Sequence, residues 1–78
     1  MQHGNGPYVE IDLAAATKIA NAKGAKSDTD RAKVFGLHPS TWSRFKRGSR
    51  TATQDVIAKV LTTCQELKFY DLFRVKSG

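Results

Sequence analysis

The chain has 78 residues, a net charge of +6 and one cysteine. Its length fits a single small domain, and its 40% hydrophobic and 26% charged residues are typical of a globular protein. A lone cysteine excludes an internal disulfide framework and favours a cytoplasmic setting, and no apolar run approaches the roughly 18 residues of a membrane span.

The positive charge is concentrated in residues 31–50. This window holds six of the 13 basic residues and none of the seven acidic ones, so the rest of the chain is neutral. A block of one sign often marks an anionic partner, and a solvated basic face that aids solubility is the alternative. The six basic residues are Arg31, Lys33, Arg44, Lys46, Arg47 and Arg50.

The N-terminal part predicts a tail and a short strand. Residues 1–7 are polar and rich in glycine, which favours a flexible tail, and His3 has no partner there at metal-ligand spacing. Tyr8–Ile11 alternates apolar and polar side chains as a strand does. We therefore expect the folded domain to cover residues 8–76.

The first helix is predicted over Leu13–Lys23. Asp12 is suited to cap its N-terminus, and Gly24 is suited to end it. Alanine and isoleucine at helical spacing predict one apolar stripe, made of Ala15, Ile19 and Ala22 with Ala16 and Ala20 beside it.

Two short helices are predicted next, over residues 27–35 and 39–47. Ser27 and Asp30 have the spacing of a capping box, and Gly36 ends the first helix. His38 is placed to cap the second helix, because Pro39 fits its first position. The predicted core anchors of this pair are Ala32, Phe35, Trp42 and Phe45.

The C-terminal part predicts a fourth helix and an ambiguous end. Thr53 caps the helix, whose buried side is predicted to hold Val56, Ile57, Val60, Leu61 and Cys64, the last as an inert buried thiol. Residues 67–76 fit either a helical turn or a strand. The aromatic side chains near both ends are either extra core or a dimer surface: Tyr8, Phe69, Tyr70 and Phe73.

Two short helices with a glycine in the turn between them are typical of a helix-turn-helix unit, whose second helix enters the DNA major groove. Ser40 and Arg44 would share its outer face, and arginine reads guanine through O6 and N7. The cations that follow suit DNA phosphates: Lys46, Arg47 and Arg50.

Residues 32–48, AKVFGLHPSTWSRFKRG, resemble the Cro/CI-like (XRE) helix-turn-helix family. The resemblance covers residues 27–64 and implies an all-α, lambda-repressor-like domain of four or five helices that binds operator DNA, often as a homodimer. It implies base contacts from Ser40, Ser43 and Arg44, with Pro39 at the edge. It implies backbone contacts from Ser27, Asp28, Thr41, Arg47 and Arg50.

The chain departs from the family pattern at two places. Arg31 stands where the family usually has an aliphatic residue, so it either reaches out over the helix pair or the packing there differs. The ending, Asp71–Val75, resembles the D-L-F-x-V tails of some actinobacterial and phage members. Such a tail would pair with Tyr8–Ile11 in a two-stranded sheet that joins the two ends of the chain.

The resemblance implies a phage or prophage repressor of the Cro type that occupies an operator and blocks the polymerase. No constellation typical of catalysis, metal binding or a cofactor site is present in the sequence, so we expect neither an enzyme nor a small-molecule substrate. The alternative is an antitoxin-like interaction module on the same fold, with residues 69–73 as its docking surface.

Overall fold

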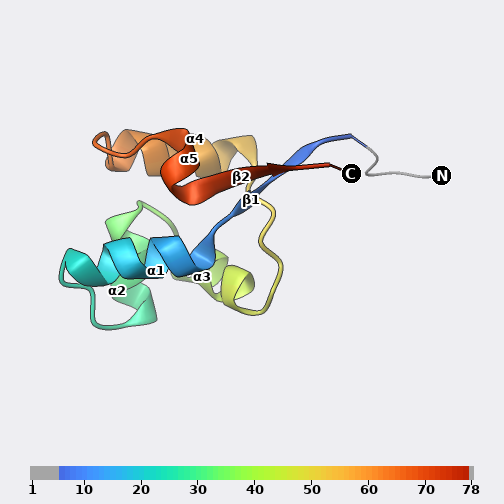
Figure 1. The fold of residues 1–78 in the computed structure, drawn as a ribbon. Helices are drawn as coiled ribbons and strands as arrows, with labels where there is room; N and C mark the ends of the chain where they lie inside the picture. Colours follow the sequence, from blue (N-terminus) through green and yellow to red (C-terminus); the bar gives the residue numbers. More distant parts are fainter. Residues whose placement is uncertain (1–5, 78) are drawn as a thin grey trace.

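Five helices and one two-stranded antiparallel sheet make up the described part of the chain, residues 6–77 of a computed structural model (Figure 1). The elements in chain order are β1 (Tyr8–Ile11), α1 (Leu13–Ala22), α2 (Asp28–Val34), α3 (Pro39–Lys46), α4 (Gln54–Thr63), α5 (Phe69–Leu72) and β2 (Phe73–Lys76). The four predicted helices are therefore confirmed to within a residue or two. Most of the predicted tail, with His3, lies outside the described residues, and Gly6 and Pro7 are exposed.

Side-chain caps fix where α1 to α4 begin, because the first backbone N–H groups of a helix have no partner within it. Asp12 Oδ1 accepts the N–H of Ala15 at 3.0 Å, and Thr53 Oγ1 accepts that of Val56 at 3.2 Å. Both caps were predicted from the sequence.

The capping box predicted for α2 is only half formed. Ser27 Oγ accepts the N–H of Asp30 at 3.1 Å, as the motif requires. The Asp30 carboxylate, however, accepts the N–H of Lys26 at 3.1 Å rather than that of Ser27.

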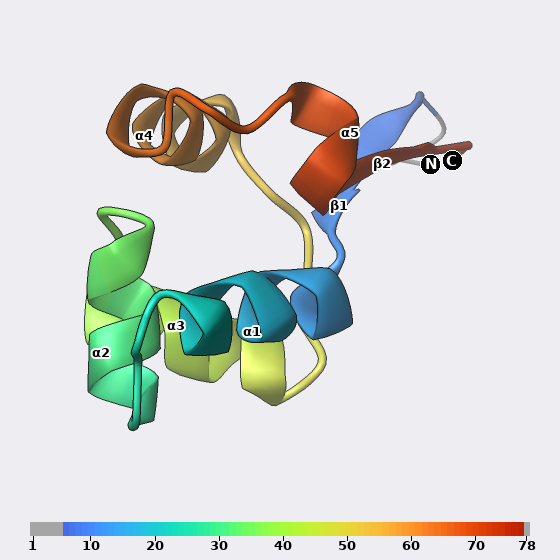
Figure 2. The ribbon, with the colours of Figure 1, turned by 60° about the vertical axis from the view of Figure 1, so that its left-hand side comes forward.

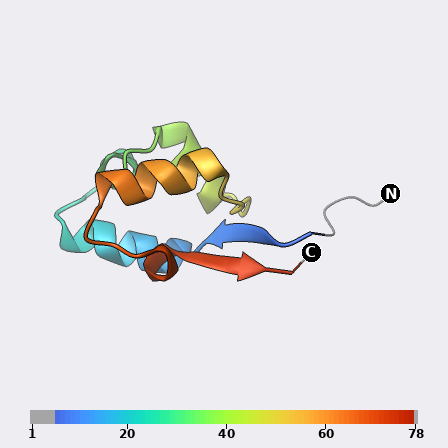
Figure 3. The same ribbon diagram turned by 90° about the horizontal axis from the view of Figure 1, so that it is seen from above.

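The ambiguous C-terminal segment forms both elements in succession. α5 ends at Leu72, and β2 starts at Phe73 and pairs with β1, so that Ile11 lies opposite Phe73 and Tyr8 opposite Lys76. The predicted sheet between the two ends of the chain is thus confirmed, and Figure 3 shows its strands running out beyond the helices.

The other edge of β1 holds the segment that follows α3. Ile11 donates its N–H to Arg50 O at 2.9 Å, and Ala52 donates its N–H to Val9 O at 2.8 Å. These hydrogen bonds tie the backbone at Arg50 to the sheet.

The core lies between α1, α2 and α3 on one side and α4 and α5 on the other (Figure 2). Its largest fully buried side chains are Trp42, Phe35, Phe45, Phe73, Leu72 and Val60. Cys64 is buried as predicted, and burial raises the pKa of its thiol. Among the described residues, no helix has both the length and the apolar character needed to cross a membrane.

One prediction about burial needs correction. In α1 the buried residues are Ala16 and Ala20, whereas Ala22 is exposed, because the helix turns a neighbouring row of small residues toward the core. Of the two alternatives for the terminal aromatics, extra core is what the structure shows for Phe73, which is buried, and for Phe69, which is half-buried and packs against the core. Tyr8 and Tyr70 are exposed. In α4, Ile57 and Leu61 are half-buried and flank the buried row.

Candidate nucleic-acid interface

The position of α3 is fixed by its caps and by two buried aromatic side chains. His38 Nδ1 accepts the N–H of Ser40 at 3.1 Å, and Pro39 occupies the first turn without needing a partner. Trp42 and Phe45 are buried, and the Trp42 ring stacks on Phe35 of the α2–α3 connection at 6.1 Å between centroids. The predicted anchors of this helix, Ala32 among them, are therefore confirmed as core residues.

Opposite these anchors, α3 presents a polar face to solvent. Its members are spaced at i, i+3, i+4 and i+7, which places them on one side of a helix of 3.6 residues per turn. All four side chains are exposed: Ser40, Ser43, Arg44 and Arg47. We call these four residues the outer face of α3.

Short contacts order the outer face. Ser40 Oγ lies 2.8 Å from His38 Nδ1, and Arg47 Nη1 donates to Ser43 Oγ at 3.1 Å. The guanidinium of Arg44 lies 5.5 Å from the centroid of the Phe45 ring. The two hydroxyls therefore lie toward the helix start and middle, and two guanidinium groups extend from its second half.

A carboxylate occupies the flank of α3 that faces α2. Asp28 Oδ1 accepts hydrogen bonds from Arg31 Nη1 at 2.8 Å and from Trp42 Nε1 at 3.2 Å. Asp28 Oδ2 accepts one from Lys46 Nζ at 2.9 Å. The hydrogen bond from Lys46 is the largest cause of a lowered pKa at Asp28, followed among the favourable contacts by that from Arg31.

Arg31 lies across the boundary between α1 and α2. Its Nε donates to Asn21 Oδ1 at 2.9 Å while its Nη1 binds Asp28, and its side chain is only 22% exposed. Arg31 therefore does not extend into solvent. It lies along α2 and is held by polar partners on α1 and α2.

The other residues predicted to contact the DNA backbone differ in their exposure and hydrogen bonding. Ser27 caps α2 with its hydroxyl, and Thr41 is half-buried. Pro39, predicted at the edge of the base contacts, is exposed.

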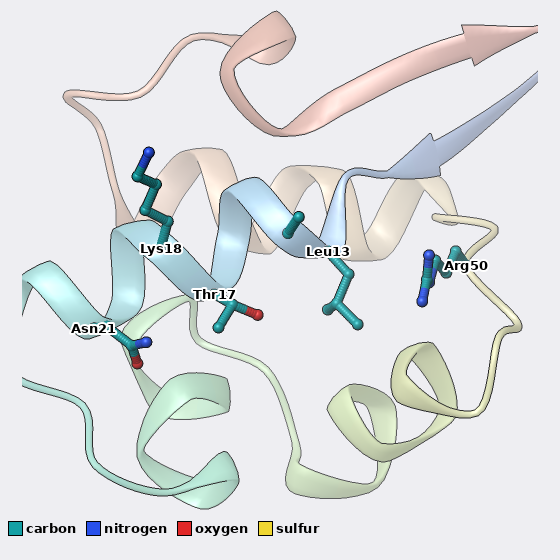
Figure 4. A pocket seen from close by; sticks show the side chains of 6 residues that line it. Leu13, Thr17, Lys18, Asn21 and Arg50 are labelled. Atoms are coloured by element: carbon teal, nitrogen blue, oxygen red, sulfur yellow. The ribbon is translucent and has the colours of Figure 1, made fainter.

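Arg50 follows α3 and borders a surface hollow of about 550 Å³. Its Nε donates to Phe45 O at 3.2 Å, so the side chain also closes the C-terminal end of α3. Figure 4 shows Leu13, Thr17 and Asn21 along one side of α1, with Arg50 reaching the hollow from the segment after α3. The cation is therefore fixed near the point where α3 ends.

The cluster around Asp28 is the feature that sequence reasoning missed. Asp28 lies three residues before the start of the basic window at Arg31, so the sum over that window counted Arg31 and Lys46 as unopposed. The spacing of Trp42 and Lys46, one turn apart on α3, indicates that the two share one side of the helix, but it does not indicate that this side faces α2.

In comparisons with known proteins, no family model, curated protein or solved structure matches this chain significantly.

Proposed function

We propose that the chain is a sequence-specific regulator that binds double-stranded DNA through a lambda-repressor-like helix-turn-helix, with α2 and α3 as the two helices. The observation that carries the proposal is the outer face of α3, which is polar, exposed and ends in two arginines, directly opposite the buried Trp42 and Phe45. A helix held in this way can enter the major groove while its buried side chains stay packed in the core.

In the proposed complex, the outer face of α3 reads base edges. Ser40 and Ser43 supply short donors and acceptors near the helix start, and Arg44 bridges O6 and N7 of a guanine. Arg47 and Arg50 bind phosphates at the C-terminal end of α3. Arg47 caps the C-terminus of the helix and contacts Ser43, and Arg50 follows the helix and contacts the carbonyl of Phe45. Binding over an operator then blocks transcription by excluding the polymerase.

The test starts with selection of a binding duplex from a random-sequence library, followed by fluorescence anisotropy on the selected and a scrambled duplex. Arg44→Ala should weaken the selected site by about 1–3 kcal/mol and relax the preference at one base pair. Lys59→Gln is the matched control, because Lys59 is an exposed cation on α4 paired with Asp55. Equal weakening on both duplexes would assign Arg44 to a phosphate, and a library without any enriched sequence would contradict the proposed function.

A homodimer on DNA belongs to the same proposal. Tyr70 and Val75 are 67% and 52% exposed, which provides apolar surface at the end of the molecule formed by α5 and the sheet. Two copies would contact half-sites about 34 Å apart. Multi-angle light scattering with and without the selected duplex measures whether one or two copies bind.

The second candidate is an antitoxin-like protein-interaction module, which the same exposed side chains favour. It predicts that Tyr70→Ser abolishes binding to a protein partner while Arg44→Ala does not. The DNA-binding proposal predicts that Arg44→Ala lowers duplex affinity whether one copy or two copies bind, whereas Tyr70→Ser lowers it only by preventing the homodimer.

A further inference from the structure

Asp28 is placed to control how strongly α3 is attracted to DNA of any sequence. It lies in the first turn of α2, and its carboxylate binds two side chains of α3, Trp42 and Lys46. An aspartate in contact with the edge of a proposed DNA-binding surface opposes phosphate binding, so its position there needs an explanation beyond the general fold.

The two carboxylate oxygens have different partners. Oδ1 binds the buried indole through Nε1 and also Arg31, while Oδ2 binds the ammonium group of Lys46 alone. The Trp42 contact holds Asp28 against the core anchor of α3. The remaining oxygen is thereby held where it draws Lys46 toward α2.

The ion pair between Lys46 and Asp28 is accessible to solvent, and this limits its contribution to stability. The side chains of Lys46 and Asp28 are 54% and 45% exposed, and an ion pair so accessible to water contributes little to stability. It does cancel a positive charge beside the outer face of α3. Arg31 is held separately by Asn21, so Lys46 is the cation whose position depends most on Asp28.

We propose that Asp28 is a positioning and specificity-determining residue, which holds Lys46 away from DNA phosphates and so weakens binding to arbitrary sequence. This inference rests on the proposed function. It revises two predictions from the sequence, because neither the Asp28 carboxylate nor Lys46 then serves as a backbone contact in the wild-type complex. The outer face of α3 then provides the discrimination between DNA sequences.

The test measures binding to a mixed-sequence duplex that lacks the selected site, across a series of salt concentrations. Asp28→Asn keeps the shape of the side chain and an oxygen for the Trp42 indole, but removes the charge that holds Lys46. Releasing one lysine to a phosphate steepens the slope of log K against log salt by about 0.9. If the variant and wild type converge at 1 M salt, the variant binds about eightfold more tightly at 0.1 M.

Lys46→Gln supplies the control in both backgrounds. In the wild type it should leave the salt slope unchanged, and in Asp28→Asn it should return the slope to the wild-type value. This pattern is one that a merely structural role for Asp28 would not produce. Circular dichroism on every variant checks that it is folded.

Three results would overturn the inference. The first is an unchanged slope for folded Asp28→Asn on a duplex that the wild type binds. The second is weaker binding of that variant to the mixed duplex. The third, which applies even if Asp28→Asn fails to fold, is a loss of about 0.9 in slope for Lys46→Gln alone. If wild type and variants all fail to bind any duplex, the proposed function is wrong and the inference falls with it.

Discussion

Trp42 serves both the core and the polar cluster beside α3. Its side chain is 1% exposed and stacks on Phe35, and its indole N–H donates to Asp28. The helical spacing of Trp42 and Phe45 was enough to predict the burial. The hydrogen bond could not be predicted, because it joins residues 14 positions apart on two helices whose relative placement the sequence does not state.

Trp42→Ala should lower the free energy of unfolding by about 3–5 kcal/mol, since it leaves a large cavity in the core. Trp42→Phe should cost less, because it keeps much of the apolar volume and loses only the indole N–H with part of the ring. Chemical denaturation followed by circular dichroism measures both. A wild-type unfolding midpoint for Trp42→Ala would contradict the burial of this side chain.

Asp28 should make the fold slightly sensitive to acid, because water screens its ion pairs with Lys46 and Arg31 and keeps their contribution to stability small. Its folded-state pKa lies below the ordinary value of 3.8, because the charged form is bound by Lys46 and Arg31. The stabilisation is therefore complete above pH 3.8 and is lost as the pH falls through the lower folded-state pKa. Thermal melts between pH 2 and 6 should show a shallower acid loss for Asp28→Asn than for wild type.

Part of the acid loss should persist in that variant. The hydrogen bond from Lys23 lowers the pKa of Glu66, so this carboxylate loses its contribution in the same direction. Curves for wild type and Asp28→Asn that run parallel over this pH range would show that the Asp28 cluster does not stabilise the folded state.

At the scale of elements, the connection between α2 and α3 depends on Gly36. Its φ is +72°, a conformation that costs an L-residue free energy. A Cβ at this position would also overlap with the side chain of Thr63 at the end of α4. The sequence predicted the glycine as a helix stop, but the approach of α4 to this turn is a tertiary contact that no local pattern contains.

Gly36→Ala should therefore destabilise the fold through two effects that can be separated. The backbone conformation alone should cost about 1–2 kcal/mol, and the overlap with Thr63 should add to it. In a Thr63→Ala background the overlap is relieved, so the same substitution should cost less. An equal cost in both backgrounds, measured by urea denaturation, would rule out the steric contribution.

The elements with local signals were the ones predicted well. Caps at Asp12, Ser27 and Thr53 and a glycine after α2 set helix bounds that the structure reproduces. The end of the chain was ambiguous because Leu72 and Phe73 are adjacent and both fully buried, one in α5 and the other in β2. Only the pairing with β1 determines where the helix gives way to the strand.

At the scale of the whole molecule, the sheet links the two ends of the chain to the segment after α3. β1 binds β2 along one edge and residues 50–52 along the other. The position of Arg50, which the proposed function assigns to a phosphate, thus depends on a strand far from it in sequence.

Removing β2 should loosen that segment. A chain that stops after Leu72 leaves β1 without its partner strand, and a strand with so little support is marginal. Hydrogen exchange followed by NMR should then show lost protection at the N–H groups of Ile11 and Ala52, which bond Arg50 O and Val9 O. Unchanged protection at these two groups would mean that the helices alone hold the segment in place.

The distribution of charge also acts at this scale. The net +6 of the chain is not spread evenly. Within the basic window, Asp28 pairs with Arg31 and Lys46, whereas Arg44, Arg47 and Arg50 lie on or just after the second half of α3. The sequence sum predicted an anionic partner without showing this division.

An NMR titration of the ¹⁵N-labelled protein with its selected duplex tests the central claim most directly. If α3 enters the major groove, the largest amide shifts fall on residues 40–47 and near Arg50, and Arg44→Ala reduces them on that duplex. Shifts confined to α5 and the sheet, with α3 unaffected, would contradict the account.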